Sequence, residues 1–311
     1  MDFDIAVPEK KECDAVALGL NAVDHLIVVP RYPEFNSKIR LTHHTVAPGG
    51  ECATAMVALS RLGLRTRYIG RVGSDAEGRF QIEWLKSQGV DVTGLIVVDG
   101  GATQTAFIII DETTGERTVI WHRDPALGIA PDHVDLDAVT AGRVLLINGP
   151  DVDACIVAAG AARAKGIPVM IDIETVYPGT ERLLPLIDLL ISSSGFPEMV
   201  TGERDLRRAL KLLAEMSGAK LTAATLGSEG ALAYCQGEYI ASPAFRIDSR
   251  DTTGAGDAFH GGFIYGLLAG YSVEDTLRFA NAVAGLKCRD VGAQTGLPGI
   301  EEVRALLDQD V

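Results

Sequence analysis

A short glycine-rich segment carries the residues best suited to chemistry. Residues 251 to 257 read Asp-Thr-Thr-Gly-Ala-Gly-Asp, and the apolar residues that follow predict a helix. Gly254 and Gly256 leave backbone N–H groups open at the positive end of that helix, where a phosphate can bind. Asp257 stands beside this anion site as a proton acceptor. The pairing of an anion site with a base indicates phosphoryl transfer to a hydroxyl group.

Glycines at such a turn can also serve only to connect a strand to a helix. Two features favour the functional interpretation. A carboxylate ends the turn, and Asp251, Thr252 and Thr253 precede it with oxygen atoms that could hold a cation. The spacing differs from the G-x-x-x-x-G-K-S/T pattern of a P-loop, so the lysine that contacts phosphates there is missing.

Composition and charge limit the classes of protein. The 311 residues are 47% hydrophobic, which is enough for one large domain or two small ones. No apolar run reaches the ~18 residues of a membrane span, and the acidic start lacks the pattern of a secretory signal. The five cysteines are widely spaced, which predicts reduced thiols in a cytoplasmic protein.

The net charge of −14 argues against a binder of nucleic acids or anionic membranes, because both need a basic face. An anionic nucleotide would need local positive charge. Backbone N–H groups and a bridging Mg²⁺ can supply it without a basic surface.

Apolar stretches rich in β-branched residues alternate with helical patterns along most of the chain. This alternation predicts an α/β, Rossmann-like fold, with a mainly parallel central sheet and helices on both faces. Strands are expected at residues 15–20, 66–69, 143–147, 168–173, 186–191 and 219–225. Helices are expected at residues 53–62, 78–88, 152–165, 203–216, 255–268, 273–287 and 300–307.

Two segments interrupt this alternation. Residues 25–46 and 103–122 show the alternating pattern of half-exposed strand pairs, with turns at residues 32–36 and 111–116. They predict a small β-sheet lid over the main sheet. Because no linker or repeat is visible, residues 1–311 are expected to form a single domain with these two excursions.

A second glycine motif lies near the amino terminus. Gly49 and Gly50 precede an alanine-rich stretch that ends at Leu62 and Gly63. Small residues allow a close approach either to a neighbouring element or to a ligand. Spacing alone leaves both explanations open.

Taken together, the motifs resemble the ribokinase-like (PfkB) family of carbohydrate kinases. The resemblance rests on residues 49–63, 70–78, 225–231 and 251–263, which follow one another in the family's order. It implies an ATP-dependent kinase that uses Mg²⁺ and phosphorylates a hydroxyl of a sugar or nucleoside. It also implies a β-sheet lid and a homodimer formed through that lid.

The resemblance assigns roles to individual residues. Asp257 is implied to be the catalytic base, and the N–H groups of Gly254, Ala255 and Gly256 to form the anion hole for the transferred phosphoryl group. The implied substrate-binding residues are Asn21, Asp24, Gly49, Gly50 and Thr54. The implied nucleotide-binding residues are Thr225, Gly227, Gly230 and Asn281. Asp251 and Thr253 occupy positions where many members hold a monovalent cation, usually K⁺.

The chain departs from the family pattern at two places. Thr54 stands where many members have an asparagine, which changes the substrate contact. The family's Asn-x-x-Glu motif, associated with Mg²⁺, should lie near Ser194, but residues 192–198 read Ser-Ser-Ser-Gly-Phe-Pro-Glu. Glu198 and the acids of residues 172–174 remain as carboxylates that could act around the metal, or as solvated and capping acids.

The sequence predicts the type of reaction more narrowly than it predicts the substrate. The serine-rich segment, His260 and Lys287-Cys288 are closest to the ketose kinases of the family, so a ketose or related furanose is the expected substrate. Arg117 and Arg123 in the second excursion could grip an anionic substituent or could be surface residues. His260 is expected to be a packed helix residue.

Three alternative functions fit the sequence less well. A nucleoside kinase of the same family needs an aromatic-lined pocket, and the lid offers few aromatic residues. A catalytically silent sugar or nucleotide sensor is disfavoured by the intact glycine turn with Asp257. A nicotinamide-dependent oxidoreductase is disfavoured because no G-x-G-x-x-G follows the first strand.

Overall fold

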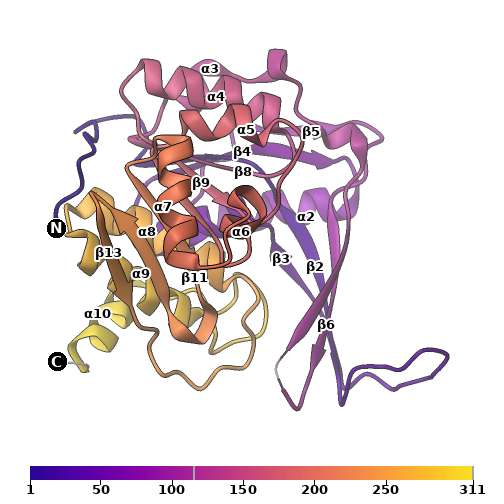
Figure 1. Ribbon diagram of the computed structural model, residues 1–311. Helices are drawn as coiled ribbons and strands as arrows, with labels where there is room; N and C mark the ends of the chain where they lie inside the picture. Colours follow the sequence, from indigo (N-terminus) through magenta and orange to yellow (C-terminus); the bar gives the residue numbers. More distant parts are fainter. Residues whose placement is uncertain (115, 310–311) are drawn as a thin grey trace.

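The central sheet organises most of the chain. The computed structural model describes residues 1–114 and 116–309, and within them nine strands form one sheet in the order β13-β12-β11-β10-β9-β8-β1-β4-β5 (Figure 1). The strands are β1 (Ala15–Leu18), β4 (Thr66–Gly73), β5 (Leu95–Val98), β8 (Val144–Asn148), β9 (Val169–Ile173), β10 (Leu189–Ser193), β11 (Leu221–Thr225), β12 (Ala231–Cys235) and β13 (Glu238–Ser242). Neighbouring strands run parallel from β5 to β11, whereas β12 and β13 pair antiparallel at one edge. The mainly parallel sheet predicted from the sequence is confirmed.

Helices cover both faces of this sheet. They are α1 (Glu51–Arg61), α2 (Ala76–Ser87), α3 (Leu136–Val139), α4 (Val152–Ala164), α5 (Thr180–Leu183), α6 (Phe196–Thr201), α7 (Leu206–Ser217), α8 (Ala255–Ala269), α9 (Val273–Lys287) and α10 (Ile300–Gln309), with short 3-10 helices at Pro125–Leu127, Pro131–His133, Leu184–Leu186 and Gly227–Glu229. Along β1, Ala15 and Ala17 pack in one core with α1, α8 and α9, whereas Val16 and Leu18 pack in a second core with α3 and α4. The strands are apolar on both sides because both sides are covered. In the described part of the chain, no helix combines the length and apolar character needed to cross a membrane.

A smaller sheet extends away from the main body (Figure 1). Its described strands are β2 (Ala22–Val29), β3 (His43–Gly49), β6 (Thr105–Asp111) and β7 (Arg117–His122), in the order β3-β2-β6-β7. Leu26, Ala106 and Ile108 contribute to a small core of its own. The strand pairs expected in the two excursions are present, although Gly115 of the expected turn lies outside the described residues. This sheet is called the lid below.

Candidate active site

The predicted glycine turn lies at the start of α8. Gly254 has a φ of 76° and directly precedes the first helical residue, Ala255. A Cβ at Gly254 would come within 2.8 Å of Ala293, so both the conformation and the space require glycine. The N–H of Ala255 donates to the carbonyl oxygen of Thr252 at 3.1 Å. A bound anion would therefore have to share or replace that hydrogen bond.

Two neighbouring cavities meet at this turn. The strand-end cavity has a volume of about 370 Å³ and is lined by residues at the carboxyl ends of β8, β9, β10 and β11. The lid cavity has a volume of about 520 Å³ and is lined by residues of both the main body and the lid. The residues that line both cavities are Glu51, Arg117, Glu174, Tyr177, Gly254 and Asp257. A chemical group could thus pass from one cavity to the other beside Asp257.

Asp24 is the buried acid of the lid cavity. It lies on β2 and is 4% exposed. Gly49 on the adjacent strand makes room for it, because a Cβ at that position would lie 2.1 Å from Asp24 Oδ2. Burial, together with the charges of Asp257 and Glu51, raises the pKa of Asp24 to about 8. In the ligand-free protein this acid therefore keeps its proton at neutral pH.

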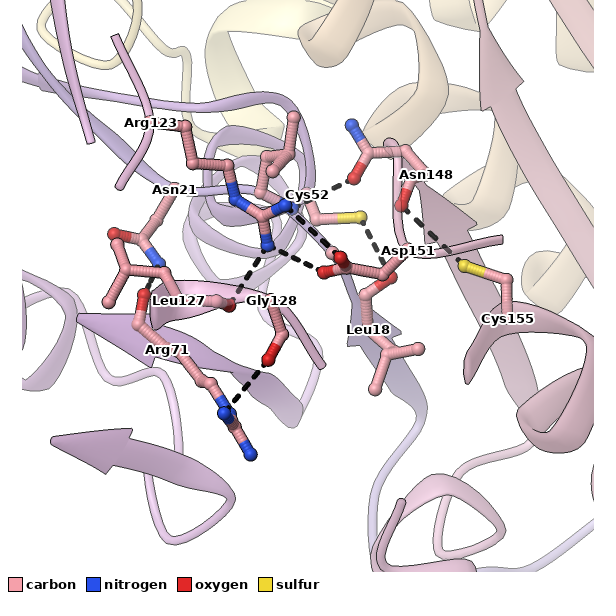
Figure 2. A network of polar contacts seen from close by, with 12 residues as sticks. Leu18, Asn21, Cys52, Arg71, Arg123, Leu127, Gly128, Asn148, Asp151 and Cys155 are labelled. Carbon is pink, nitrogen blue, oxygen red and sulfur yellow. Dashed lines mark hydrogen bonds and ion pairs between the residues drawn. The ribbon is translucent and has the colours of Figure 1, made fainter. Parts of the chain in front are cut away.

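Gly50, in the wall of the lid cavity, packs closely against Asn21 behind it. Gly50 has a φ of 88°, and a Cβ there would lie 2.2 Å from Asn21 Cα. Asn21 Nδ2 donates to the hydroxyl of Tyr68 at 2.7 Å. It also donates to the carbonyl oxygen of Arg71 at 3.1 Å, as Figure 2 shows. The paired glycines therefore have a packing role, which the spacing alone had left open. Gly50 also lines the lid cavity, so its position is compatible with a close approach to a ligand as well.

Thr54 is fully buried, and its hydroxyl accepts a hydrogen bond from Gln294 Nε2 at 3.1 Å. Among the described residues, Thr54, Asn21 and Gly49 do not line either cavity. These residues lie one layer behind the cavity walls, and their direct contact with a substrate stays a prediction.

The strand-end cavity is strongly acidic. Glu51, Asp172, Glu174 and Asp257 all line it. Burial raises the pKa of Asp257, Asp172 and Glu51, and the negative charges of the neighbouring carboxylates raise each of them further. A cation bound here would be favoured because it relieves this repulsion.

The residues predicted to bind nucleotide gather in the strand-end cavity. Its lining includes Thr225, Gly227, Gly230 and Asn281. Asn281 is 5% exposed, and its Nδ2 donates to the carbonyl oxygen of Ser242 at 2.9 Å. That amide therefore also ties α9 to the end of β13.

His260 behaves as a packed residue of α8. It is 2% exposed, and burial lowers its pKa to about 4. Its ring nitrogens lie 2.8 Å from the carbonyl oxygen of Gly256 and 3.4 Å from that of Ile191. Its Nδ1 also lies 3.4 Å from Asp172 Oδ2, and the residue lines the strand-end cavity. His260 is therefore packed as expected, and its exclusion as a second base stays a prediction.

The carboxylates considered for metal binding lie in two different parts of the structure. The Glu198 side chain is 55% exposed and pairs with Arg204 at 3.6 Å, so it is a solvated acid on α6. Asp172 and Glu174, at the end of β9, line the strand-end cavity instead. Only these two of the sequence candidates are placed beside the glycine turn.

The two arginines of the second excursion also differ. Arg123 pairs with Asp151 at 2.5 Å and donates to the carbonyl oxygen of Leu127 at 3.0 Å, and Figure 2 shows this cluster. It therefore fixes the base of the lid to the loop after β8. Arg117 contacts the Thr252 hydroxyl beside the glycine turn. Arg117 lines both cavities and Arg123 lines the lid cavity, so both arginines are placed to meet an anion, with Arg117 at the junction.

Sequence reasoning missed several polar residues of the site, among them Glu51 and Gln104. Glu51 lines both cavities, and its only local signal is its position directly after the paired glycines. Gln104 lines the lid cavity, is 8% exposed, and its Oε1 is buried without a hydrogen-bond partner. Such an oxygen is costly unless a ligand satisfies it.

The sequence pattern of pfkB family carbohydrate kinases matches residues 14–300. The chain belongs to this family. It is 28% identical to 5-dehydro-2-deoxygluconokinase of Shouchella clausii, with 98% of each chain covered. It is 29% identical to a nucleoside kinase of Methanothermobacter thermautotrophicus, with 93% of this chain and 94% of the relative covered. Among solved structures, Arabidopsis thaliana ribokinase complexed with ribose and ATP is similar at a TM-score of 0.81 and 26% identity, covering 95% of this chain and 98% of that one.

As a pfkB family carbohydrate kinase, the chain is a phosphotransferase with an alcohol group as acceptor, as the glycine turn and its acid predicted. Membership confirms the reaction class and the fold. It does not choose among substrates, because relatives of similar identity carry both sugar and nucleoside kinase names.

Proposed function

We propose that this pfkB kinase transfers the γ-phosphoryl group of ATP to a hydroxyl of a ketose or related furanose. The position of Asp257 at the junction of the two cavities carries the proposal. The strand-end cavity holds the residues predicted to contact the nucleotide, and the lid cavity holds Asp24. ATP in the first cavity and a sugar in the second would meet at Asp257.

Asp257 would act as the base. A sugar hydroxyl is a very weak acid, so the carboxylate orients it and accepts its proton late, as the bond to the transferred phosphoryl group forms. Burial raises the pKa of Asp257, which increases its strength as a base once it is ionised. The start of α8 at Gly254 and the guanidinium of Arg117 would stabilise the negative charge of the transferred group.

The acids of the strand-end cavity fit Mg²⁺. Asp172 and Glu174 supply carboxylate oxygens, which Mg²⁺ prefers, and they would take the part of the missing Asn-x-x-Glu motif. Among the described residues, no three His, Cys, Asp or Glu side chains are placed to hold a metal by themselves. Mg²⁺ commonly keeps water and phosphate ligands, so one or two carboxylates suffice. When bound, it would neutralise charge on the phosphate oxygens.

Asp24 and Gln104 would bind sugar hydroxyls in the lid cavity. Protonated Asp24 can both donate and accept a hydrogen bond, and Gln104 Oε1 lacks a partner until a donor arrives. Val119 and Trp121 of β7 supply an apolar wall. The lid would exclude water, which otherwise competes for the phosphoryl group.

A nucleoside is the second candidate substrate. Trp121 lines the lid cavity and is 58% exposed, so its ring is free to stack on a base. One relative is itself a nucleoside kinase.

We further propose that the whole chain acts as one kinase domain and forms a homodimer through its lid. Ala106 and Ile108 line the lid cavity, so Phe107 between them faces the opposite side of the sheet, where it is 44% exposed. Ile120 on β7 is 55% exposed. A second copy would cover these apolar side chains. The five cysteines are free and buried, which supports the cytoplasmic location expected from the sequence.

A coupled assay of ADP release tests the substrate. The panel contains ketoses, aldoses, sugar acids, sulfonated sugars and nucleosides, each with Mg·ATP. The proposal expects the highest kcat/KM with a ketose or furanose, and Asp257→Asn controls for contaminating kinases. Preference for nucleosides would favour the second candidate, whereas no turnover with any acceptor would contradict both.

A further inference from the structure

A buried lysine contacts the turn that precedes the anion site. Lys287 is the last residue of α9 and is fully buried. Its ammonium group donates to the backbone carbonyl oxygen of Asp251 at 2.9 Å. Asp251 and Thr253 are the two residues that the resemblance connects with K⁺, so the ammonium group and such an ion would compete for the same oxygen.

Asp251 organises the turn that precedes the anion site. Its carboxylate accepts hydrogen bonds from the N–H and the hydroxyl of Thr253, at 2.9 and 2.7 Å. The other carboxylate oxygen accepts from the N–H of Gly292 at 2.8 Å. These bonds are buried, and Gly254 follows Thr253 directly. Any positive charge that fixes Asp251 therefore also fixes the direction of the N–H groups at the start of α8.

Charge balance explains why the lysine can stay there. Burial lowers the pKa of Lys287, and the negative charge of Asp251 offsets only part of that shift. An ammonium group carries the same single positive charge as K⁺ and, unlike the ion, is covalently held in place. The ordering of the turn then needs no ion from solution.

We propose that the ammonium group of Lys287 is a built-in monovalent cation that replaces K⁺ beside the turn of residues 251–253. The inference rests on the proposed kinase function for its catalytic consequence, because the turn leads into the anion site. It makes the enzyme independent of K⁺, in contrast to what the family resemblance implies for Asp251 and Thr253.

A merely structural lysine would behave differently. Its ammonium group would favour the negative end of α9 and fill space, so its removal would lower stability without creating a preference for any ion. If the ammonium group instead takes the place of a cation, removing it leaves a site that fits a monovalent ion of similar size. K⁺ or NH₄⁺ should therefore restore the Lys287→Met variant, and Na⁺ should restore it less.

Thermal unfolding of the wild type and Lys287→Met is measured in KCl, NH₄Cl, NaCl and N-methyl-D-glucamine chloride at equal ionic strength. The wild-type midpoint should be the same in all four salts. The variant should melt lower in N-methyl-D-glucamine chloride and regain about 2 to 5 °C in KCl or NH₄Cl. Lys220→Met, which removes a half-exposed lysine paired with Asp4, is the matched control and should show no selectivity among the salts.

Turnover provides the second readout. The variant's kcat should be at least about tenfold below wild type in NaCl and should rise at least about threefold in KCl. A variant whose midpoint and kcat respond equally to all salts would overturn the proposal. So would a wild type that K⁺ stabilises or activates over Na⁺, a result that needs no variant to fold. Unfolding does not depend on the substrate, so failure of the kinase assignment would be seen separately.

Discussion

The Asp24→Asn substitution should make the folded protein more stable and the enzyme much less active. Asp24 is 4% exposed, and burial raises its pKa from 3.8 to about 8. Between these values the folded protein keeps a proton that the unfolded chain has released. The free energy of unfolding of the wild type therefore falls as pH rises through this range, by about 1.4 kcal/mol per pH unit from this group alone.

Asparagine has no proton to release, so the free energy of unfolding of the variant does not fall with pH in this way. Its stability relative to wild type should grow by about 3 to 4 kcal/mol between about pH 5 and about pH 8. Urea unfolding at several pH values measures this difference directly. Asp132→Asn removes an exposed carboxylate and is the matched control, which should change the stability little at each pH.

The activity of the variant tests the second half of the prediction. Asparagine keeps the size of Asp24 but loses its acidic hydroxyl, so kcat/KM for the sugar should fall by at least about 10²-fold. The KM for ATP should stay within a few-fold, because Asp24 lines the lid cavity and not the strand-end cavity. A stability difference that does not change with pH would refute the reasoning, since it would show that folded Asp24 is ionised throughout.

Three further substitutions test the assignment of the site. Asp257→Asn should lower kcat by about 10²- to 10⁴-fold with nucleotide affinity within a few-fold, measured by turnover and by ADP binding; near-normal turnover would remove Asp257 from the role of base. Gln104→Leu should raise the KM for the sugar by about 5- to 30-fold while leaving the KM for ATP unchanged, because one hydroxyl loses its acceptor. Gly49→Ala should cost about 1 to 3 kcal/mol of stability and weaken sugar binding, because its Cβ displaces Asp24; unchanged melting would show that the strand relaxes.

Elements with strong local signals were predictable from the sequence. The apolar strands at 143–147 and 168–173 correspond to β8 and β9, and the expected helix at 273–287 is α9. The hairpin of β12 and β13 was missed. Its turn places Gln236 and Gly237 at φ values of 50° and 87°, without the Asn-Gly or Asp-Gly pair that usually marks such a turn.

The site was predictable where its residues are contiguous in sequence. The glycine turn and Asp257 form one uninterrupted segment, so their chemistry could be read directly. Lys287 and Asp251 are 36 residues apart, and only the packing of α9 brings the ammonium group to the carbonyl oxygen. Gln104 has no neighbouring motif, because its role depends on the lid cavity that β2 and β6 form with the main body.

The charge of the site explains how an acidic protein can handle a polyanion. Glu51, Asp172, Glu174 and Asp257 line the cavity proposed for the nucleotide. Burial, followed by repulsion from neighbouring carboxylates, raises the pKa of Glu51, Asp172 and Asp257. Free ATP would add to that repulsion. In Mg·ATP the metal ion would bring positive charge to this cavity, so that the carboxylates could serve as its ligands and Asp257 could ionise as the proposed base. On the proposed assignment of the site, these acids would disfavour the nucleotide alone and favour its metal complex, from which transfer can occur.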